Sequence, residues 1–435
     1  MKTLRIAVLV TLATATLLAL RPGPAGAVPV FARKYGLNCT NCHSGFPRLN
    51  DWGQRYRANG YRLPGRENEE KTVLESPPPF ALRTSYGYTH ERCETGAEGT
   101  NASGFRVHGL DVLSAGVIAP HVSYLMVYPP QLAGSRGVQE QEGTIEMVSV
   151  VFSGLGSPWL NVRAGRFEPA YAAFSVKRHL TVTPYEVYEY AFPGGSPFSE
   201  TQEGLEVTGS GRGFAYAAGL VNGSATNRPD DGPSDAYARA AMVIGAGEGQ
   251  TAGQRVGVTG YFGRARPEGG IDALQTYSRF GVDASLNLKQ VNLAAQWLYA
   301  QDQKALWSPD LADDVCWSGF FVELSWQPLV ECVAFARYDQ VDGPGGIVQE
   351  DVTRLTGGGR YYFADNLALH LEYSRRTLDT AARTDPIEDL ATARLDFGFR
   401  RPDEAKPAPM PRGPSSPRGA CFRACHPQAA APACR

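Results

Sequence analysis

The residues most able to do chemistry are two cysteines and a histidine near the N-terminus. Cys39, Cys42 and His43 form a CxxCH motif, which is the attachment motif of c-type haem. In this motif each thiol bonds covalently to the porphyrin and the histidine ligates the iron. The alternatives are a disulfide or half of a zinc site, but a zinc site needs further ligands nearby and the next cysteine is Cys93. The motif therefore predicts a covalently bound haem c, with His43 as the proximal iron ligand.

A second group of the same residue types lies close to the C-terminus. Cys421, Cys425 and His426 form CxxxCH, which is one residue longer than the usual motif. They belong to a Pro-rich tail, residues 401–435, whose first part is too poor in apolar residues to fold alone. This group predicts either a second haem or, alternatively, a disulfide or a metal-binding tail.

The N-terminus has the features of an export signal. Positively charged residues precede an apolar stretch from Ile6 to Leu20, and Ala25-Gly26-Ala27 fits a cleavage site. Residues 1–27 are therefore expected to be a signal peptide, so that the mature chain starts at Val28. A membrane anchor is the alternative, but the apolar stretch is short for a spanning helix. Export agrees with the CxxCH motif, because bacterial c-type haem is attached outside the cytoplasm.

Composition narrows the class of protein. The chain has 435 residues, including 48 glycines and 31 prolines, and a formal net charge of -2. A near-neutral charge gives no reason to expect a nucleic-acid partner. Beyond the signal peptide no run of about 18 apolar residues occurs, which argues against helical membrane spans. A soluble β-rich enzyme and an outer-membrane barrel both fit these facts.

Side chains alternate in character from Phe80 to Arg400. In the clearest stretch, Phe280 to Leu288, apolar residues alternate with Gly, Asp, Ser and Asn, which is typical of strands. We predict about sixteen strands, near residues 80–91, 103–117, 121–129, 144–154, 159–167, 203–209, 213–222, 235–245, 254–264, 276–288, 291–301, 316–327, 331–341, 351–363, 367–376 and 388–400.

The links between these strands alternate in length. Short turns such as Lys289-Gln290 alternate with long polar links, near residues 92–102, 130–143, 168–202, 223–234, 265–275, 302–315, 342–350 and 377–387. Short turns on one side and long loops on the other are typical of an outer-membrane barrel. The fold predicted for residues 80–400 is therefore all-β, an antiparallel transmembrane barrel of about sixteen strands.

The haem segment, residues 28–63, precedes this barrel and is joined to it by a charged and Pro-rich linker, residues 64–79. Leu49, Trp52 and Tyr56 are spaced as one face of a short helix, and Gly60 is expected to end it. About 36 residues are too few to bury a core of their own. An even number of strands puts both barrel ends in the periplasm, and a barrel of this size leaves a channel unless it is filled. We therefore expect the haem segment to plug the lumen rather than to hang below it.

The residues around the motif resemble a known family. Val28 to Gly36, the CxxCH motif, Phe46 to Gly53 and Asn59-Gly60-Tyr61 are similar to the fused monohaem cytochrome–porin family. The resemblance implies an N-terminal c-type haem on Cys39, Cys42 and His43 and a C-terminal outer-membrane barrel. Some members are outer-membrane iron oxidases. Those members have Gln-Thr where this chain has Lys34-Tyr35, so the resemblance implies electron transfer more firmly than it implies Fe(II) as the donor.

The longest link, residues 168–202, carries several functional side-chain types. It contains His179, Tyr185, Glu186, Tyr188, Glu189 and Tyr190. One interpretation is an approach to the haem for a substrate or metal, and the other is a surface loop with its own aromatic packing. The acid pairs Glu186 with Glu189 and Asp313 with Asp314 are either metal-attracting or simply solvated.

The sequence does not single out a sixth ligand for the haem iron. No methionine lies in the haem segment. The candidates outside it are Met126, Met147, Met242, Met410, His90, His108, His121, His179 and His370. His370 is expected to face the lumen, where a hydrogen-bonded side chain is more common than a ligand.

The function expected from these features is electron transfer across the bacterial outer membrane. Electrons would pass between an extracellular donor or acceptor, such as Fe(II)/Fe(III), and a periplasmic c-type cytochrome through the covalent haem. The lipid of the outer membrane would surround the barrel, with both termini in the periplasm. The alternatives are a passive porin with a structural haem and a periplasmic haem enzyme such as a peroxidase. No histidine follows His43 in the haem segment to act as a distal acid–base group, which argues against the peroxidase.

Overall fold

The structure is a computed structural model of the chain. It describes residues 35, 41–45, 48–63, 71–75, 79–96, 98–130, 145–157, 159–190, 198, 201–211, 213–223, 235–245, 253–265, 275–303, 314–344, 350–364, 367–380 and 386–399. Among these residues no helix is both long and apolar enough to cross a bilayer.

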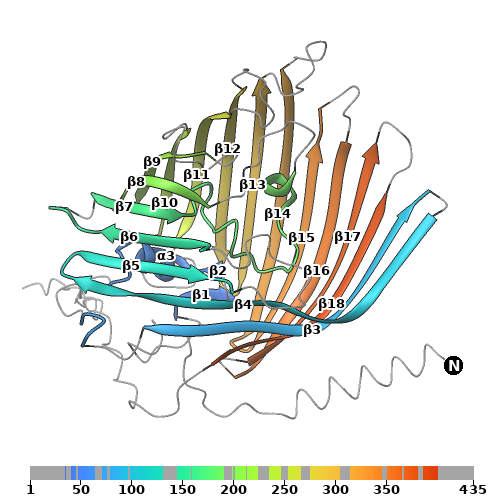
Figure 1. Cartoon of the computed structure of the whole chain (residues 1–435), viewed down its shortest axis with the longest axis horizontal. Helices are drawn as coiled ribbons and strands as arrows, with labels where there is room; N and C mark the ends of the chain where they lie inside the picture. The colour runs from blue at the N-terminus through green and yellow to red at the C-terminus, as the bar shows by residue number, and fades with distance from the viewer. Residues whose placement is uncertain are drawn as a thin grey trace, which may run out of the picture.

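Sixteen antiparallel strands form one closed barrel, in which each strand pairs with its neighbours in sequence and the last pairs with the first. Figure 1 shows this barrel from the side. The strands are Phe80–Thr95 (β3), Glu98–Ala119 (β4), Val122–Tyr128 (β5), Met147–Phe152 (β6), Asn161–Phe167 (β7), Gln202–Gly211 (β8), Phe214–Val221 (β9), Asp235–Ile244 (β10), Gln254–Ala265 (β11), Gln275–Leu288 (β12), Val291–Gln303 (β13), Val315–Leu329 (β14), Cys332–Asp342 (β15), Glu350–Ala364 (β16), Leu367–Thr380 (β17) and Ile387–Phe399 (β18). The predicted barrel and its strand number are confirmed.

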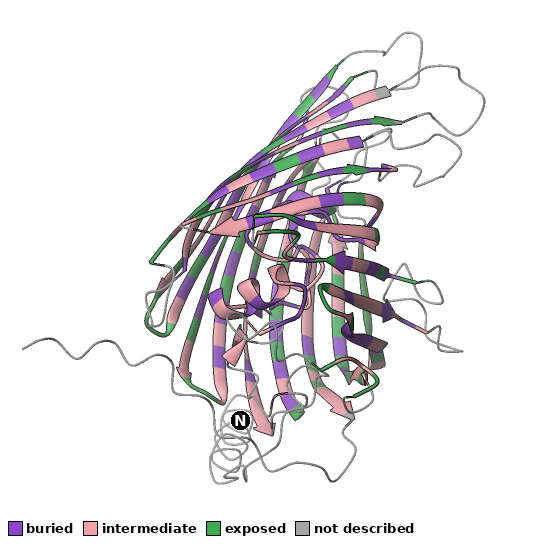
Figure 2. Cartoon of the chain, turned by 90° about the vertical axis from the view of Figure 1, so that its left-hand side faces the viewer, coloured by how far each residue is buried: buried purple, intermediate pink, exposed green. Residues whose placement is uncertain are grey.

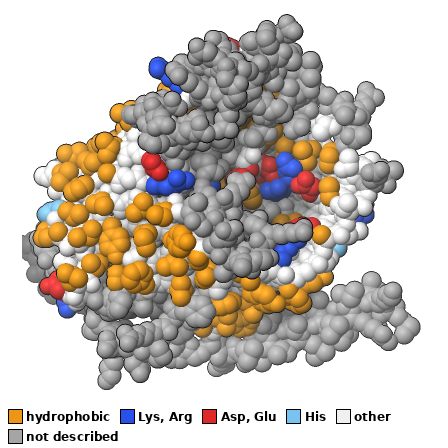
Figure 3. All heavy atoms as spheres, viewed as in Figure 1, with side chains coloured by type: hydrophobic (Ala, Val, Ile, Leu, Met, Phe, Trp, Pro, Cys, Tyr) orange, Lys and Arg blue, Asp and Glu red, His pale blue; other side chains and the backbone are white. Residues whose placement is uncertain are grey.

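Apolar side chains point outward and polar ones point into the lumen. On β12, Phe280 and Leu288 are 49% and 65% exposed, whereas Arg279 and Asp283, whose side chains point to the other face, are 2% and 1% exposed. Buried and exposed residues alternate along the strands in the same way elsewhere (Figure 2). Hydrophobic side chains cover much of the outer wall, and charged side chains gather in the hollow (Figure 3). A water-soluble sandwich would bury its apolar face, so this inverted arrangement is that of a barrel with lipid outside.

One rim of the barrel carries the short turns and both barrel ends. Lys289 and Gln290 join β12 to β13 at this rim. Phe80 starts β3 and Phe399 ends β18, and because strands alternate in direction around the barrel, both residues lie at the same rim as this turn. The opposite rim carries the long links. This sorting of links is the pattern that the sequence predicted.

One predicted long link is wrong. Residues 92–102 do not form a loop, because β3 runs to Thr95 and β4 starts at Glu98, with Gly96 in the left-handed region (φ 61°) at the turn. The two strands have 16 and 22 residues, whereas about 10 residues cross a bilayer. Polar residues that looked like a loop therefore continue the sheet beyond the membrane, where both faces can be solvated. Cys93 lies on this strand and not in a loop.

The described part of residues 28–63, called the plug from here on, lies inside the barrel, and its helix is drawn at mid-height beside β5 and β6 in Figure 1. It consists of a small hairpin, His43–Gly45 (β1) with Arg48–Leu49 (β2), and the helix Asp51–Ala58 (α3). The side chain of Asn50 caps α3 by accepting from Gly53 N at 2.9 Å. Gly60, in the left-handed region (φ 64°), follows the C-terminus as expected.

Candidate functional site

The plug is fixed to the lumen wall by one buried arginine. Arg48 Nη1 lies 2.8 Å from Glu323 Oε1 on β14 and donates to Asn292 Oδ1 on β13 at 3.0 Å. Its other terminal nitrogen donates to the hydroxyl of Tyr185 at 3.0 Å. The side chains of Arg48 and Glu323 are 5% and 0% exposed. One side chain therefore joins the plug, the barrel wall and the link between β7 and β8.

The helix makes further polar contacts along its length. Asp51 Oδ1 pairs with Arg255 on β11 at 3.0 Å, and Gln54 donates to the carbonyl of Ala173 at 2.8 Å. Beyond the helix, Arg62 donates to Ser153 Oγ at 2.8 Å. Together with the contacts of Arg48 on β13 and β14, the contact at Ser153 after β6 reaches the opposite part of the wall, so the segment is held across the lumen and not at one edge.

His43 is oriented by a backbone hydrogen bond. Its Nδ1 lies 3.2 Å from the carbonyl oxygen of Arg48, and because a carbonyl only accepts, Nδ1 is the protonated nitrogen. The lone pair of the neutral ring is then on Nε2. Metal-binding histidines are usually fixed in this way by a donor bond from the other nitrogen.

Cys42, the neighbour of His43, is a half-buried free thiol. Burial raises the pKa of the Cys42 thiol to about 11, so the thiol is protonated at neutral pH. Cys39 and the C-terminal group Cys421, Cys425 and His426 lie outside the described residues. Cys93, Cys316 and Cys332 are also free thiols.

Gly53 sets the distance between α3 and the CxxCH motif. A Cβ atom at this position would lie 2.2 Å from the carbonyl oxygen of Cys42 and 2.9 Å from Leu49 Cδ2. Only a residue without a side chain allows this approach. The glycine therefore has a packing role, although it sits inside a helix.

We expect Gly53→Ala to destabilise the plug. Helix propensity alone favours alanine by up to about 1 kcal/mol, but overpacking a fixed backbone contact typically costs about 1–3 kcal/mol. Trypsin should cut the plug of the variant faster than that of the wild type, at arginines such as Arg57. Gly104→Ala is the control, because nothing lies within 4 Å of a Cβ there. Equal cutting rates in Gly53→Ala and wild type would show that the contact is not tight.

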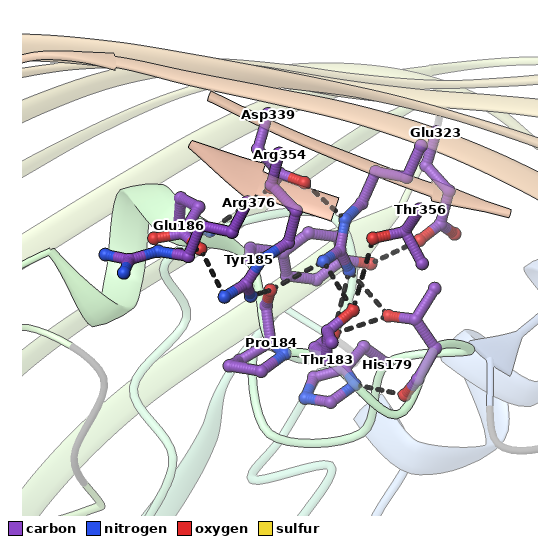
Figure 4. Close-up of polar contacts among 12 residues, drawn as sticks. His179, Thr183, Pro184, Tyr185, Glu186, Glu323, Asp339, Arg354, Thr356 and Arg376 are labelled. Carbon is purple, nitrogen blue, oxygen red and sulfur yellow. Dashed lines mark hydrogen bonds and ion pairs between the residues drawn. The ribbon is translucent and has the colours of Figure 1, made fainter. Parts of the chain in front are cut away.

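The link between β7 and β8 folds into the lumen. Arg337 on β15 donates from all of its nitrogens, to Asp339 (2.7 Å), to the hydroxyls of Thr181 and Thr183, and to the carbonyls of Thr183 and Pro184. Its side chain is fully buried. Figure 4 shows this link lying against the strand wall. It is therefore an inward loop and not a surface loop.

A carboxylate on β17 holds the same loop. Glu372 accepts from the backbone N–H groups of Val182 (2.6 Å) and Thr183 (3.0 Å). The same carboxylate lies 3.0 Å from Nε2 of His370, whose Nδ1 accepts from Arg360. Both ring nitrogens of His370 are therefore engaged, as expected for a hydrogen-bonded lumenal histidine.

The acidic residues of the loop have separate roles. Glu186 pairs with Arg354 at 2.7 Å and with Arg376 at 3.1 Å (Figure 4), whereas Glu189 is exposed. Asp314 is exposed and Asp313 lies outside the described residues. Across the described part of the chain, no group of three or more His, Cys, Asp or Glu is arranged to hold a metal ion.

Arginines dominate the lumenal wall formed by β15 to β18. Glu186 is shared by two of them, and Asp396 is shared by Arg360 (3.1 Å) and Arg394 (2.9 Å). Together with Arg337, these arginines place five guanidinium groups on four consecutive strands, at more than one level of the barrel. Period-two alternation could have placed these side chains in the lumen, but nothing in the sequence indicated which carboxylates they meet.

Aromatic rings fill the lumen beside the inward loop. Tyr185 stacks on Phe321 with ring centres 4.1 Å apart, and Tyr188 and Phe198 continue the contact toward Tyr261. These rings belong to one buried cluster with side chains of β9 to β16. The predicted aromatic packing of the link is confirmed, but it forms with the barrel wall and not within the loop alone.

A closed barrel of sixteen antiparallel strands with an apolar outer wall and an inward loop defines a porin-type protein of the bacterial outer membrane. The sequence profile of the phosphate-selective porin O and P family matches residues 94–399. This is more than half of the chain, and the chain belongs to that family. The match leaves out the CxxCH segment.

Solved structures agree with this fold. The chain is similar to an anion-selective porin from Comamonas acidovorans (TM-score 0.53, 11% identity, covering 74% of this chain and 99% of that one). It is also similar to the outer membrane channel DcaP of Acinetobacter baumannii (TM-score 0.53, 11% identity, covering 74% and 97%). At this identity the likeness shows the fold alone. A comparison with curated proteins finds no match.

Proposed function

We propose that this porin carries electrons across the outer membrane through a haem c held in its lumen. The observation that carries the proposal is the position of the CxxCH motif. His43 is held by the carbonyl of Arg48, and the side chain of Arg48 is bonded to the barrel wall. The Cys42-His43 end of the motif is thereby tied to the wall of a barrel that spans the membrane.

In this proposal different residues have different roles. Cys39 and Cys42 would anchor the porphyrin, and His43 would ligate iron through Nε2. Arg48, Asp51 and Gln54 keep the segment docked. A bound haem would supply transfer of one electron at a time. The donor outside, for example Fe(II), loses one electron and becomes Fe(III), and a ferric cytochrome c on the periplasmic side gains it.

The test uses liposomes that contain the full chain and enclose ferric cytochrome c. External Fe(II) should reduce the enclosed cytochrome with the wild-type chain and not with Cys39→Ala or Cys42→Ala. Covalent haem staining on a denaturing gel should be present in the wild type and lost in Cys39→Ala. Cys93→Ala, which removes a free thiol outside the motif, should behave as the wild type. Absence of covalent haem from the wild type, or equal reduction by Cys42→Ala, would refute the proposal.

A passive porin with a structural haem is the second candidate. Membership of the porin family supports it more directly than it supports electron transfer. The arginines on β15 to β18, two pairs of which share one carboxylate each, would favour anions in such a channel.

Conductance in planar bilayers separates the two candidates. If the chain is an electron conduit, the docked plug and the inward loop stay in the lumen and obstruct it. The wild-type chain should then conduct ions poorly. A passive porin would instead give open steps in the wild type, with a reversal potential that reports anion preference in a KCl gradient.

A further inference from the structure

One histidine of the inward loop is held by a backbone carbonyl in the way that metal-binding histidines often are. His179 donates from Nδ1 to the carbonyl of Thr181 at 2.7 Å, so the lone pair of its neutral ring is on Nε2. No residue in the described ranges is hydrogen-bonded to that nitrogen. The ring is half-buried. His43 is held by a backbone carbonyl in the same manner.

A short series of contacts links the two histidines. The ring of His179 packs edge-on against Tyr185 with centres 5.7 Å apart. The hydroxyl of Tyr185 accepts from Arg48, and the carbonyl of Arg48 holds His43. In Figure 4 the ring of His179 lies below Thr183, on the side of the drawn residues away from the strand wall. The inward loop is therefore connected from His179 to the plug through Tyr185 and Arg48.

Three other histidines are less suited to this role. Both nitrogens of His370 are engaged, by Arg360 and Glu372. His108 uses Nε2 for Thr89 on the neighbouring strand. His90 is exposed and bonded to Ser103, on the part of the β3–β4 hairpin that extends past the membrane.

His121 is the strongest competitor, because its Nδ1 also lies at a carbonyl, that of Ser153, at 2.9 Å. However, Ser153 contacts Arg62, which follows the C-terminal end of α3. The eight residues of α3 span about 12 Å. They separate Arg62, and therefore the neighbouring His121, from the CxxCH motif at the other end of the helix. His121 is also exposed, in the turn between β4 and β5.

We propose that His179 would be a second protein ligand, through Nε2, to the iron of a haem bound at the motif, with His43 as the first. The inference rests on the proposed function, because it needs a haem on Cys39 and Cys42. Ligation is donation of a lone pair, so no proton leaves the neutral ring. It would join the plug and the inward loop through one metal, and ligation by two imidazoles instead of imidazole and thioether would keep the reduction potential low.

The test is the ligation state of purified full-length protein with its haem attached. Electron paramagnetic resonance and near-infrared magnetic circular dichroism of the ferric wild type should show low-spin iron with two imidazole ligands. His179→Ala should retain covalent haem staining but become high-spin, and added imidazole should restore the low-spin spectrum. His179→Met should stay low-spin with a higher midpoint potential. His121→Ala is the matched control and should leave the spectrum unchanged.

The outcomes separate this inference from the function on which it rests. A wild type without covalent haem would defeat the proposed function and the ligand assignment together. A wild type with covalent haem but with thioether ligation or high-spin iron would overturn the assignment alone. An unchanged spectrum in His179→Ala would do the same. The wild-type spectrum gives this answer even if a variant fails to fold, which migration on an unheated gel would reveal.

Discussion

Arg48→Met should release the plug while leaving the barrel closed. The substitution keeps much of the side-chain volume but removes the partner of Glu323, whose side chain is fully buried. An unpaired buried charge of this kind costs about 3–5 kcal/mol, which shifts the docking equilibrium roughly a hundredfold or more. Trypsin should then cut within residues 48–62, and bilayer conductance should rise. The carbonyl that holds His43 is unchanged in this variant, so the histidine contact is not removed directly.

Two further variants make the result interpretable. Arg57→Gln is the control, because its ion pair with Glu168 is long (3.9 Å) and its side chain is 31% exposed, so a loss of no more than about 1 kcal/mol is expected. The double variant Arg48→Met with Glu323→Leu should dock better than Arg48→Met alone, because it removes both charges. If the double variant is released as readily as the single one, the buried charge is not the cause.

Arg337→Met should free the inward loop from the wall. It leaves Asp339 buried without its cation, and it leaves the carbonyls of Thr183 and Pro184 without this donor. We expect a loss of about 3–5 kcal/mol in loop docking. Arg337→Lys should recover only part of it, because lysine has three donors where arginine has five. The readout is trypsin cleavage at Lys177 or Arg178 from the outside of intact liposomes.

A matched arginine provides the comparison for that experiment. Arg375 on β17 is 50% exposed and lies 3.9 Å from Asp389, so Arg375→Met should change docking by less than about 1 kcal/mol. Loop cleavage in Arg337→Met at the rate of Arg375→Met would mean that the loop is held by its aromatic contacts instead.

The barrel could be predicted because the patterns that indicate it involve residues close together in the sequence. Alternation such as that from Phe280 to Leu288 follows from the pleat of a strand with lipid on one side, and link lengths alone sorted the two rims. The error at residues 92–102 has the same origin. There the strands leave the membrane, so the apolar face that marks a strand is no longer required.

The partners inside the lumen could not be predicted. Arg48 and Asn292 are 244 positions apart, and a lumenal arginine has the same local pattern as a solvated one. The link from residue 168 to 202 has no periodicity to indicate which way it folds. Its aromatic residues were consistent with a surface loop, and only contacts with residues such as Phe321 and Arg337 distinguish the two positions.

The distance along the chain between the plug and its anchors has a consequence for biogenesis. Contacts between residues this far apart form late, since closing so large a loop costs more entropy than local pairing. The CxxCH segment is thus synthesised long before β13 and β14 exist to receive it. Cys42 is half-buried after docking, so an enzyme that modifies the thiol has its best access while the chain is still an unassembled precursor. Modification of the thiol would then precede docking of the plug, so a delay in modification would leave barrels that are closed but hold an unmodified plug.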